Sequence, residues 1–240
     1  MVKSTMGFAF VVLVDRSGMQ PQQYEEVTGA AGLVARLRHV YWIGGGSGAG
    51  KSTTARRLAD RYGWRFYATD DVMHDHAGRT TSEDAPYLHR FIDMSMDERW
   101  VNRSPEVMLE TFHWFRGEGF GLIIEDLLRL PQETCVIVEG FRLLPHLVKP
   151  LLAAPEHAVW LLPTPDFRRA AILSRSAPED GFLWRTSDPA QAGRNIAERD
   201  RMFTQRLRDE TERLQLRTVQ VDITMSEDDL AEQVTTAFRL

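Results

Sequence analysis

The strongest constraint on this chain is a glycine-rich segment with the spacing G-x-x-x-x-G-K-[ST], which runs from Gly45 to Ser52. The apolar run Val40–Ile43 precedes it, and Thr53–Tyr62 follows as a predicted helix that ends at Gly63. The order strand, glycine loop and helix is the context in which this spacing binds phosphate. Glycines let successive backbone N–H groups turn toward anionic oxygens, and the helix N-terminus adds a positive dipole end. A glycine turn that merely joins a strand to a helix is disfavoured, because both flanks fit.

The motif predicts which residues bind a nucleotide. Lys51 is expected to reach the β- and γ-phosphates and to neutralise developing charge, and the Ser52 hydroxyl is expected to ligate Mg²⁺. The predicted nucleotide-binding set combines the loop, the next helical residue and one arginine far along the chain: Gly45, Gly46, Ser47, Gly48, Ala49, Gly50, Lys51, Ser52, Thr53 and Arg175.

Short apolar runs and helical segments alternate after the loop. The candidate strands are Val40–Ile43, Arg65–Ala68, Thr134–Val138, Ala158–Leu162 and Thr218–Val221. Most are continuous apolar runs, which is typical of strands covered on both faces. The helices between them indicate a parallel sheet built with right-handed crossovers, and therefore an α/β fold. The last helix is predicted to begin at Ser226, with Asp229 as its capping-box partner.

The composition fits one domain with an appendage. With 240 residues, of which 43% are hydrophobic, the chain can bury one sizeable core. We assign residues 39–240 to that domain, and residues 1–38 to an N-terminal extension with a strand at Phe8–Val14 and a helix at Pro21–Leu37. A net charge of −5 disfavours a general nucleic-acid binder, and no apolar run approaches the roughly 20 residues of a membrane span. The single cysteine, Cys135, allows no internal disulfide and favours the reducing cytoplasm.

Two insertions interrupt the regular alternation, and both follow the carboxyl ends of strands, where parallel sheets bind ligands. Residues 72–133 are predicted to form a helical insertion on the substrate side. Within it, Met108, Phe112 and Phe115 recur at helical spacing, which favours the core of a small helical cap. His113 lies among these residues and could face a substrate.

The second insertion, residues 166–209, contains nine arginines and is predicted to form a mobile lid that closes over phosphates. Arg199 is the first candidate for a catalytic arginine and Arg175 the second, although a solvated helix face would explain any single arginine here. Outside this segment, Arg142 is a candidate clamp for an anionic group of the acceptor.

Carboxylates follow two of the predicted strands beside the glycine loop. Asp70 is the candidate base and acceptor contact, because phosphoryl transfer to an alcohol needs a carboxylate that accepts the hydroxyl proton. Capping of the next helix is the alternative for Asp70 and the favoured one for Asp71. Glu139 ends the third strand and is predicted to hold Mg²⁺ with Ser52, directly or through water. Gly140 would let the backbone approach a ligand, although an ordinary strand end followed by a turn is the alternative.

Together these motifs resemble the P-loop small-molecule kinases related to adenylate, shikimate and gluconate kinases. The resemblance rests on Gly45–Ser52, Asp70, the phrase Val138-Glu139-Gly140 and the arginine-rich segment. The strand-Glu-Gly pattern is also similar to uridine and 2-phosphoglycerate kinases, and Thr-Asp-Asp to chloramphenicol-phosphotransferase relatives. The resemblance implies a P-loop NTPase three-layer α/β/α sandwich with a five-stranded parallel sheet of order 2-3-1-4-5. It also implies ATP and Mg²⁺ as cosubstrates and an adenine contact near Ile223–Ser226.

These features predict an ATP-dependent kinase that transfers a γ-phosphoryl group to a hydroxyl of a small molecule. A homodimer is possible, and neither nucleic acid nor a membrane is expected as a partner. The first insertion shows no clear arginine motif for a monophosphate, so a nucleotide acceptor is disfavoured. The alternative is an ATP-binding regulatory or interaction module without turnover, in which the N-terminal extension and the aromatic insertion would serve a partner.

Overall fold

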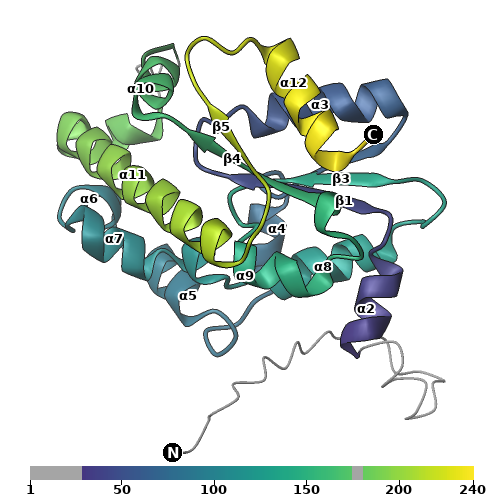
Figure 1. Ribbon diagram of the computed structural model, residues 1–240. Coiled ribbons are helices and arrows are strands. Elements are labelled where there is room, and N and C mark those ends of the chain that lie inside the picture. Colours follow the sequence, from purple (N-terminus) through teal and green to yellow (C-terminus); the bar gives the residue numbers. More distant parts are fainter. Residues whose placement is uncertain (1–28, 175–180) are drawn as a thin grey trace, which may run out of the picture.

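The computed structural model describes residues 29–174 and 181–240, and its centre is one parallel sheet (Figure 1). Five strands pair in the order β2-β3-β1-β4-β5. Their bounds are β1 (Val40–Gly45), β2 (Arg65–Ala68), β3 (Val136–Glu139), β4 (Ala158–Pro163) and β5 (Thr218–Val221). All four pairings are parallel. The predicted sheet order is confirmed, and the fold is that of P-loop NTPases.

Helices cover both faces of the sheet and make the three layers. The helices outside the insertions are α2 (Ala30–Arg36), α3 (Lys51–Tyr62), α9 (Pro145–Val148) and α12 (Glu227–Phe238), with short 3-10 turns η2 (Lys149–Leu151) and η3 (Pro155–His157). Figure 1 shows α3 and α12 on one side of the sheet and α8, α9 and α11 on the other. Neighbouring strand residues alternate between these sides: Ile43 packs with Leu58 and Leu230, whereas Trp42 packs in the cluster that contains Phe203. This burial on both faces explains why the sequences of the central strands β1, β3 and β4 are nearly continuous apolar runs.

The first insertion folds into several short helices with clear start signals. They are α4 (Met73–Gly78), α5 (Pro86–Asp93), α6 (Met96–Trp100), α7 (Pro105–Thr111), η1 (His113–Arg116) and α8 (Phe120–Arg129). Ser95 and Glu98 form a capping box at α6, and the Ser104 side chain caps α7. Met108 is 1% exposed and Phe115 is 7% exposed, but Phe115 belongs to the main core cluster with Trp42 and Phe203 and not to a separate core of a helical cap.

The second insertion contains α10 (Pro165–Ser174), η4 (Phe182–Arg185) and the long helix α11 (Pro189–Arg213). The Asp188 side chain caps α11 by accepting a hydrogen bond from the backbone of Gln191. Farther along α11, Phe203 and Leu207 are each 1% exposed and belong to the core beneath the sheet. The segment predicted as a lid therefore includes residues of a core layer, and Arg175 lies outside the described residues.

The structure tests the predictions for the C-terminal end of the chain more fully than those for the N-terminal end. The Ser226–Asp229 capping box is confirmed at the start of α12, with the Asp229 N–H donating to Ser226 Oγ at 3.1 Å. The predicted strand Phe8–Val14 and residues 21–28 of the predicted helix Pro21–Leu37 lie outside the described residues, whereas the rest of that range contains α2.

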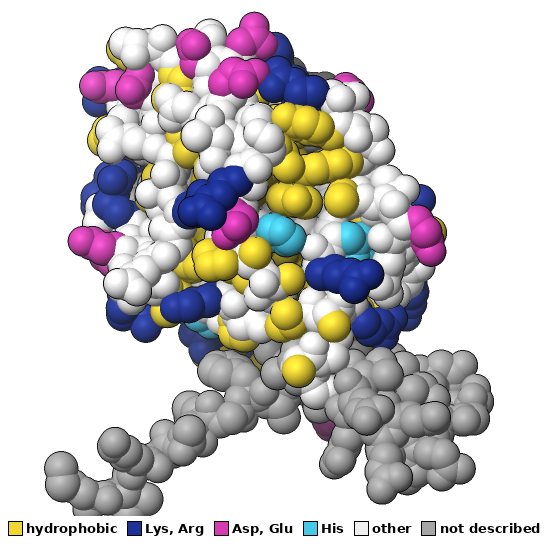
Figure 2. All heavy atoms as spheres, turned by 45° about the vertical axis from the view of Figure 1, so that its right-hand side comes forward, with side chains coloured by type: hydrophobic (Ala, Val, Ile, Leu, Met, Phe, Trp, Pro, Cys, Tyr) yellow, Lys and Arg dark blue, Asp and Glu magenta, His cyan; other side chains and the backbone are white. Residues whose placement is uncertain are grey.

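The surface mixes charges of both signs. Arg57 forms ion pairs with Glu227 and Asp228 that join α3 to α12. On the face shown in Figure 2, basic and acidic side chains lie in small separate groups around hydrophobic side chains. Among the described residues, no helix combines the length and the apolar character needed to cross a bilayer.

Candidate active site

The phosphate-binding loop takes the backbone conformation that its glycines permit. Gly45, Gly48 and Gly50 have φ values of 136°, 76° and 78°, which are rare for residues with a side chain. A Cβ at Gly45 would lie 2.2 Å from the Leu161 carbonyl oxygen. One at Gly46 would lie 2.6 Å from Thr204 Oγ1, so the loop is pressed between β4 and α11.

The residues after the loop bring a cation and a hydroxyl to the same place. Lys51 Nζ donates to the Gly46 carbonyl at 2.8 Å, so the ammonium curls over the loop. Ser52 Oγ donates to Glu139 Oε1 at 2.9 Å across the gap between α3 and the end of β3. The two residues predicted to hold Mg²⁺ are thus hydrogen-bonded to each other, and their role as metal ligands stays a prediction. Two hard oxygen donors at the edge of a phosphate loop fit Mg²⁺, which takes its other ligands from phosphates and water.

Strand register places the carboxylates beside one another. Ala68 and Ile43 lie opposite Glu139 in the two neighbouring strands, and the Thr69 N–H donates to the Glu139 carbonyl at 2.9 Å. Burial raises the pKa of Glu139, although Lys51 and the Ser52 hydroxyl oppose the shift. Burial also raises the pKa of Asp70, again against the effect of Lys51. Asp70 keeps an exposed face at the mouth of the site, so solvent moderates this effect.

The structure shows whether the carboxylates that follow β2, Asp70 and Asp71, cap the next helix. Helix α4 begins after Val72, and no side chain caps it by a hydrogen bond. Asp70 instead accepts a long hydrogen bond of 3.4 Å from Thr69 Oγ1 and supplies a backbone carbonyl to Met73. The Asp70 carboxylate is therefore available for chemistry rather than used as a helix cap.

Gly140 is required by the close packing of the two strand ends. Its φ is 151°, and a Cβ there would lie 1.7 Å from Thr69 Oγ1. We expect Gly140→Ala to lower the free energy of unfolding by about 2 kcal/mol or more, through steric overlap and backbone strain. Thermal denaturation measures this change. The control is Gly121→Ala, where the new methyl group meets nothing within 4 Å and should stabilise α8 slightly. An equal melting temperature for the two variants would contradict the expected overlap.

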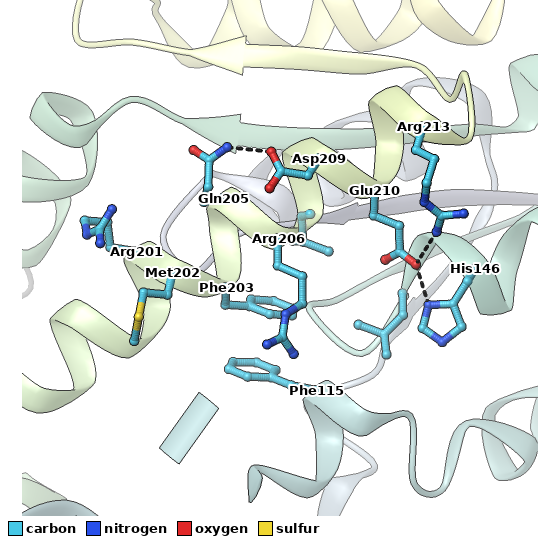
Figure 3. A pocket seen from close by; sticks show the side chains of 12 residues that line it. Phe115, His146, Arg201, Met202, Phe203, Gln205, Arg206, Asp209, Glu210 and Arg213 are labelled. Carbon is cyan, nitrogen blue, oxygen red and sulfur yellow. Dashed lines mark hydrogen bonds and ion pairs between the residues drawn. The ribbon is translucent and has the colours of Figure 1, made fainter. Parts of the chain in front are cut away.

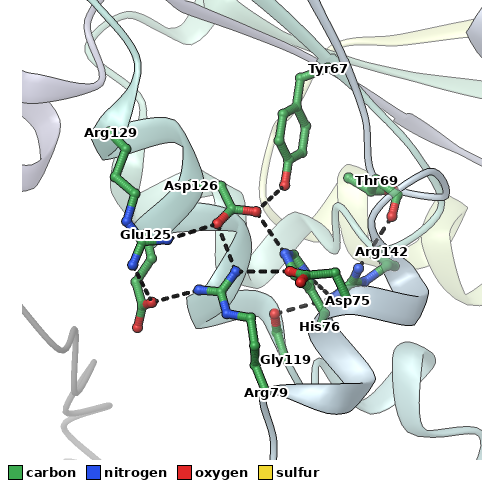
Figure 4. A network of polar contacts seen from close by, with 10 residues as sticks. All are labelled: Tyr67, Thr69, Asp75, His76, Arg79, Gly119, Glu125, Asp126, Arg129 and Arg142. Atoms are coloured by element: carbon green, nitrogen blue, oxygen red, sulfur yellow. Dashed lines mark hydrogen bonds and ion pairs between the residues drawn. The ribbon is translucent and has the colours of Figure 1, made fainter.

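A buried polar network behind the carboxylates holds the end of β2 (Figure 4). Asp126 of α8 accepts hydrogen bonds from Tyr67 Oη and His76 Nε2, each at 2.8 Å. Arg142 donates to the Thr69 carbonyl at 3.2 Å and to His76 Nδ1 at 3.0 Å. A guanidinium can only donate, so the His76 proton must be on Nε2 and the imidazole is neutral.

This network changes the interpretation of Arg142. Its side chain is 1% exposed, stacks over the Trp114 ring at 4.0 Å from the centroid, and also donates to the Gly119 carbonyl. Burial lowers its pKa to about 10, which still leaves it charged at neutral pH. Arg142 therefore supports the loop that carries Asp70, and the structure does not place it as the open anion clamp that we predicted.

Removing the charge of Asp126 tests the network. Burial opposes ionisation of Asp126, but hydrogen bonds from His76, Arg79 and Tyr67 outweigh it and hold its pKa below the usual value. A carboxylate with a lowered pKa stabilises the fold above its unfolded pKa and loses this effect as the pH falls through its folded pKa. We expect Asp126→Asn to lower the free energy of unfolding at neutral pH by about 2 kcal/mol.

The difference from wild type should begin to shrink below about pH 4, where the carboxylate of the unfolded chain takes up a proton, and should be lost as the pH falls through the lowered pKa of the folded protein. Urea denaturation across this pH range measures it. Asp75→Asn is the matched control, because its exposed carboxylate forms only a 3.2 Å ion pair with Arg79. A difference that persists unchanged in acid would show that the effect of Asp126 is not electrostatic.

Two cavities flank the phosphate loop on opposite sides. The first, about 390 Å³, is lined by Gly48, Gly50 and Thr53 of the loop and by Phe167 and Ile223. The adenine contact predicted near Ile223–Ser226 therefore lies on the wall of a cavity that opens onto the loop.

The second cavity, about 270 Å³, lies on the carboxylate side. We call it the aromatic pocket, and its lining residues are Ser47, Met73, Phe91, Trp100, Phe112, His113, Trp114, Phe115, Phe141, Arg199, Asp200 and Phe203. His113 is one of its lining residues, and its contact with a substrate stays a prediction. Sequence reasoning missed Phe91, Trp100 and Phe141, because no periodicity relates these residues, and it missed Phe167 on the other side.

Arg199 lines the aromatic pocket, but its guanidinium is already engaged. It donates from Nε and Nη2 to Asp200 Oδ1 at 2.8 and 2.6 Å. It also lies 4.7 Å from the centroid of Phe112. Among the described arginines of residues 166–209, only Arg199 lines either cavity beside the loop. Its predicted catalytic role remains a prediction.

A cavity larger than these two lies on the other side of the Phe115–Phe203 pair, along α11 (Figure 3). It measures about 570 Å³, and Figure 3 shows Arg206 and Phe203 directed toward it. The rings of Phe115 and Phe203 are stacked with centroids 3.6 Å apart, and both residues also line the aromatic pocket. No residue of the glycine loop lines the large cavity, so it is not the phosphate site.

Comparison with known protein families gives a match to part of the chain. A family model described as shikimate kinase matches residues 47–84, a minor part of the chain. The matched segment includes Lys51, Ser52 and Asp70, and it supports a P-loop kinase that acts on a small molecule. No match was found among curated proteins.

Proposed function

We propose that this protein is a kinase that transfers the γ-phosphoryl group of ATP to a hydroxyl of a small molecule. The observation that carries the proposal is the pair of cavities on the two sides of the phosphate loop. One cavity suits the nucleotide and the other an acceptor. Asp70 lines neither cavity, but it follows β2 near Lys51, whose charge opposes the rise of its pKa. The match to shikimate kinase over residues 47–84 supports the same class of reaction.

On the nucleotide side, the backbone amides from Gly45 to Thr53 would bind the phosphates at the start of α3. Lys51 would move from the Gly46 carbonyl onto the phosphates and balance the charge that develops there. Ser52 and Glu139 would hold Mg²⁺, with Glu139 acting directly or through water. The metal ion, when bound, neutralises charge on the β- and γ-phosphates.

On the acceptor side, Asp70 would accept the proton of the attacking hydroxyl. The acceptor oxygen forms a bond to the γ-phosphorus, and the bond from that phosphorus to the bridging oxygen breaks with ADP as the leaving group. A raised pKa brings Asp70 closer to the operating pH and makes it a stronger base. Arg199 lines the acceptor cavity and is the remaining candidate among the described arginines of residues 166–209, but it would have to leave Asp200 to stabilise the transferring group.

Two measurements test the function. Calorimetry should detect binding of ATP in the presence of Mg²⁺, and a panel of small hydroxylated metabolites and antibiotics should contain compounds that stimulate release of ADP. Binding of ATP without acceptor-dependent release of ADP across the whole panel would favour a nucleotide-binding module without turnover. An absence of nucleotide binding would refute both functions.

A further inference from the structure

The aromatic pocket has a composition that restricts what can occupy it. Seven of its twelve lining residues are Phe or Trp, and Met73 adds another apolar side chain. The rings pack closely, with the Phe91 centroid 5.3 Å from that of Trp100 and 5.6 Å from that of Phe112. Its volume of about 270 Å³ equals that of about nine water molecules in the liquid, which suits one compact ring system.

The three ionisable residues in the wall present no net charge to the pocket. Arg199 and Asp200 form an ion pair with each other, with a shortest N···O distance of 2.6 Å. His113 is 2% exposed, and burial, reinforced by Arg142 and other nearby arginines, lowers its pKa to about 3. Its imidazole is therefore neutral at physiological pH.

A charged acceptor would fit this environment poorly. An anion would find the Arg199 charge already balanced by Asp200, and burying an unpaired charge among rings is strongly unfavourable. A cation would meet rings that already bind arginines of the protein, since Arg99 lies 4.9 Å from the Phe91 centroid and Arg142 lies 4.0 Å from that of Trp114. Neutral molecules avoid both penalties.

The wall nevertheless offers hydrogen bonds to a neutral group. His113 Nδ1 and Arg199 Nη1 are buried and have no hydrogen-bond partner among the described residues. Arg199 can only donate, whereas the neutral imidazole can donate or accept. Neither nitrogen has accessible surface in the pocket, so a neutral oxygen on a ring would satisfy these unmet hydrogen bonds only after the two side chains shift toward it.

We propose that the phosphoryl acceptor is a compact, uncharged alcohol with an aromatic ring, which packs against Phe91, Trp100 and Phe112. Ser47 and Met73 line the same pocket, and the Met73 N–H donates to the Asp70 carbonyl at 3.3 Å, so an alcohol side arm that passes Met73 extends toward the loop and Asp70. This proposal rests on the proposed kinase function and adds the chemical class of its acceptor. The transfer is the one described above, in which the hydroxyl proton passes to Asp70 and ADP leaves.

A matched series of probes tests the class. Benzyl, phenethyl and cinnamyl alcohols are the neutral probes, para-carboxybenzyl and para-aminomethylbenzyl alcohols are their charged counterparts, and shikimate is a polar carboxylate. We expect kcat/KM, measured by release of ADP, to be at least about tenfold higher for the best neutral alcohol than for any charged compound. A charged compound that performs as well or better would overturn this proposal and leave the kinase function standing.

A different outcome would challenge the function itself. If ATP and Mg²⁺ bind but neither these probes nor the broad panel stimulate release of ADP, the kinase function fails, and this proposal fails with it. Binding alone, measured by quenching of tryptophan fluorescence, would not rescue either conclusion.

Placing a charge in the wall of the aromatic pocket tests whether the acceptor binds there. Met73 is half-buried at the start of α4, so Met73→Lys can place an ammonium group in the pocket. We expect the ratio of kcat/KM for para-carboxybenzyl alcohol to that for benzyl alcohol to rise by about tenfold or more. Met73→Leu should keep the wild-type order of preference. An unchanged ratio in a folded Met73→Lys protein that still binds ATP would place the acceptor elsewhere. If that variant does not fold, the probe series with the wild-type protein decides.

Discussion

Replacing Lys51 with alanine should lower kcat/KM for phosphoryl transfer by about a thousandfold, because charge developing on the transferring group would lose its buried cation. The ammonium already lies against the loop, with Nζ 2.8 Å from the Gly46 carbonyl oxygen. It also moderates the raised pKa values of Asp70 and Glu139. The loss should therefore be larger than that of an ordinary surface charge, and the helices and sheet should remain folded.

Release of ADP with the best acceptor found in the screen measures this effect, and far-UV circular dichroism checks the fold. Lys149→Ala is the matched control, because Lys149 is exposed and donates only to the Leu214 carbonyl, away from the loop. The control should keep nearly full activity. Near wild-type transfer by Lys51→Ala would refute the assignment of the loop as the phosphate site.

Asp70→Asn should leave binding of ATP intact and lower transfer by about a hundredfold to ten-thousandfold, the range of a lost general base. An amide has the same shape as the carboxylate but cannot accept the hydroxyl proton. Asp71→Asn is the neighbouring control and should have a much smaller effect. If Asp71→Asn removed transfer while Asp70→Asn retained it, the base would be Asp71 and our assignment would be wrong.

The pH dependence gives an independent check on Asp70. Burial raises its pKa, so the wild-type rate should fall in acid at a pH above the usual aspartate value of about 3.9. A raised pKa means that the folded protein binds the proton more tightly, so stability falls as the pH rises from the unfolded to the folded pKa. Asp70→Asn removes this penalty, and its melting temperature at neutral pH should not be lower than that of wild type. A clearly lower value would indicate that the carboxylate stabilises the fold.

The parts of the fold that local chemistry determines were predictable. Residues 40–45 and 51–62 follow from an apolar run and a glycine spacing, and the Ser226–Asp229 cap follows from a short motif. The proximity of Ser52 to Glu139 was also predictable. Ser52 comes after β1 and its loop, Glu139 ends β3, and both strands end at the same edge of a parallel sheet.

Other features depend on contacts between distant segments and could not be predicted in this way. The sequence places Arg142 beside the site, but its bonds to Thr69 and His76 depend on how α4 and α8 pack. The aromatic pocket combines Phe91 with Phe203, which are far apart in the chain and share no period. Hydrophobic pattern predicts that such rings are buried, but it does not predict which rings leave a space between them.

The contact between the loop and α11 links the two substrates. Thr204 Oγ1 lies 2.6 Å from the position that a Cβ of Gly46 would take. The same hydroxyl donates to the Asp200 carbonyl at 2.9 Å, one helical turn earlier. A single stiff helix thus touches both the phosphate loop and, through Asp200, the aromatic pocket. A shift of α11 that improves the fit of one substrate would change the fit of the other, and thermodynamic reciprocity makes the two effects equal. Binding at the phosphate loop and binding in the aromatic pocket would then be coupled rather than independent.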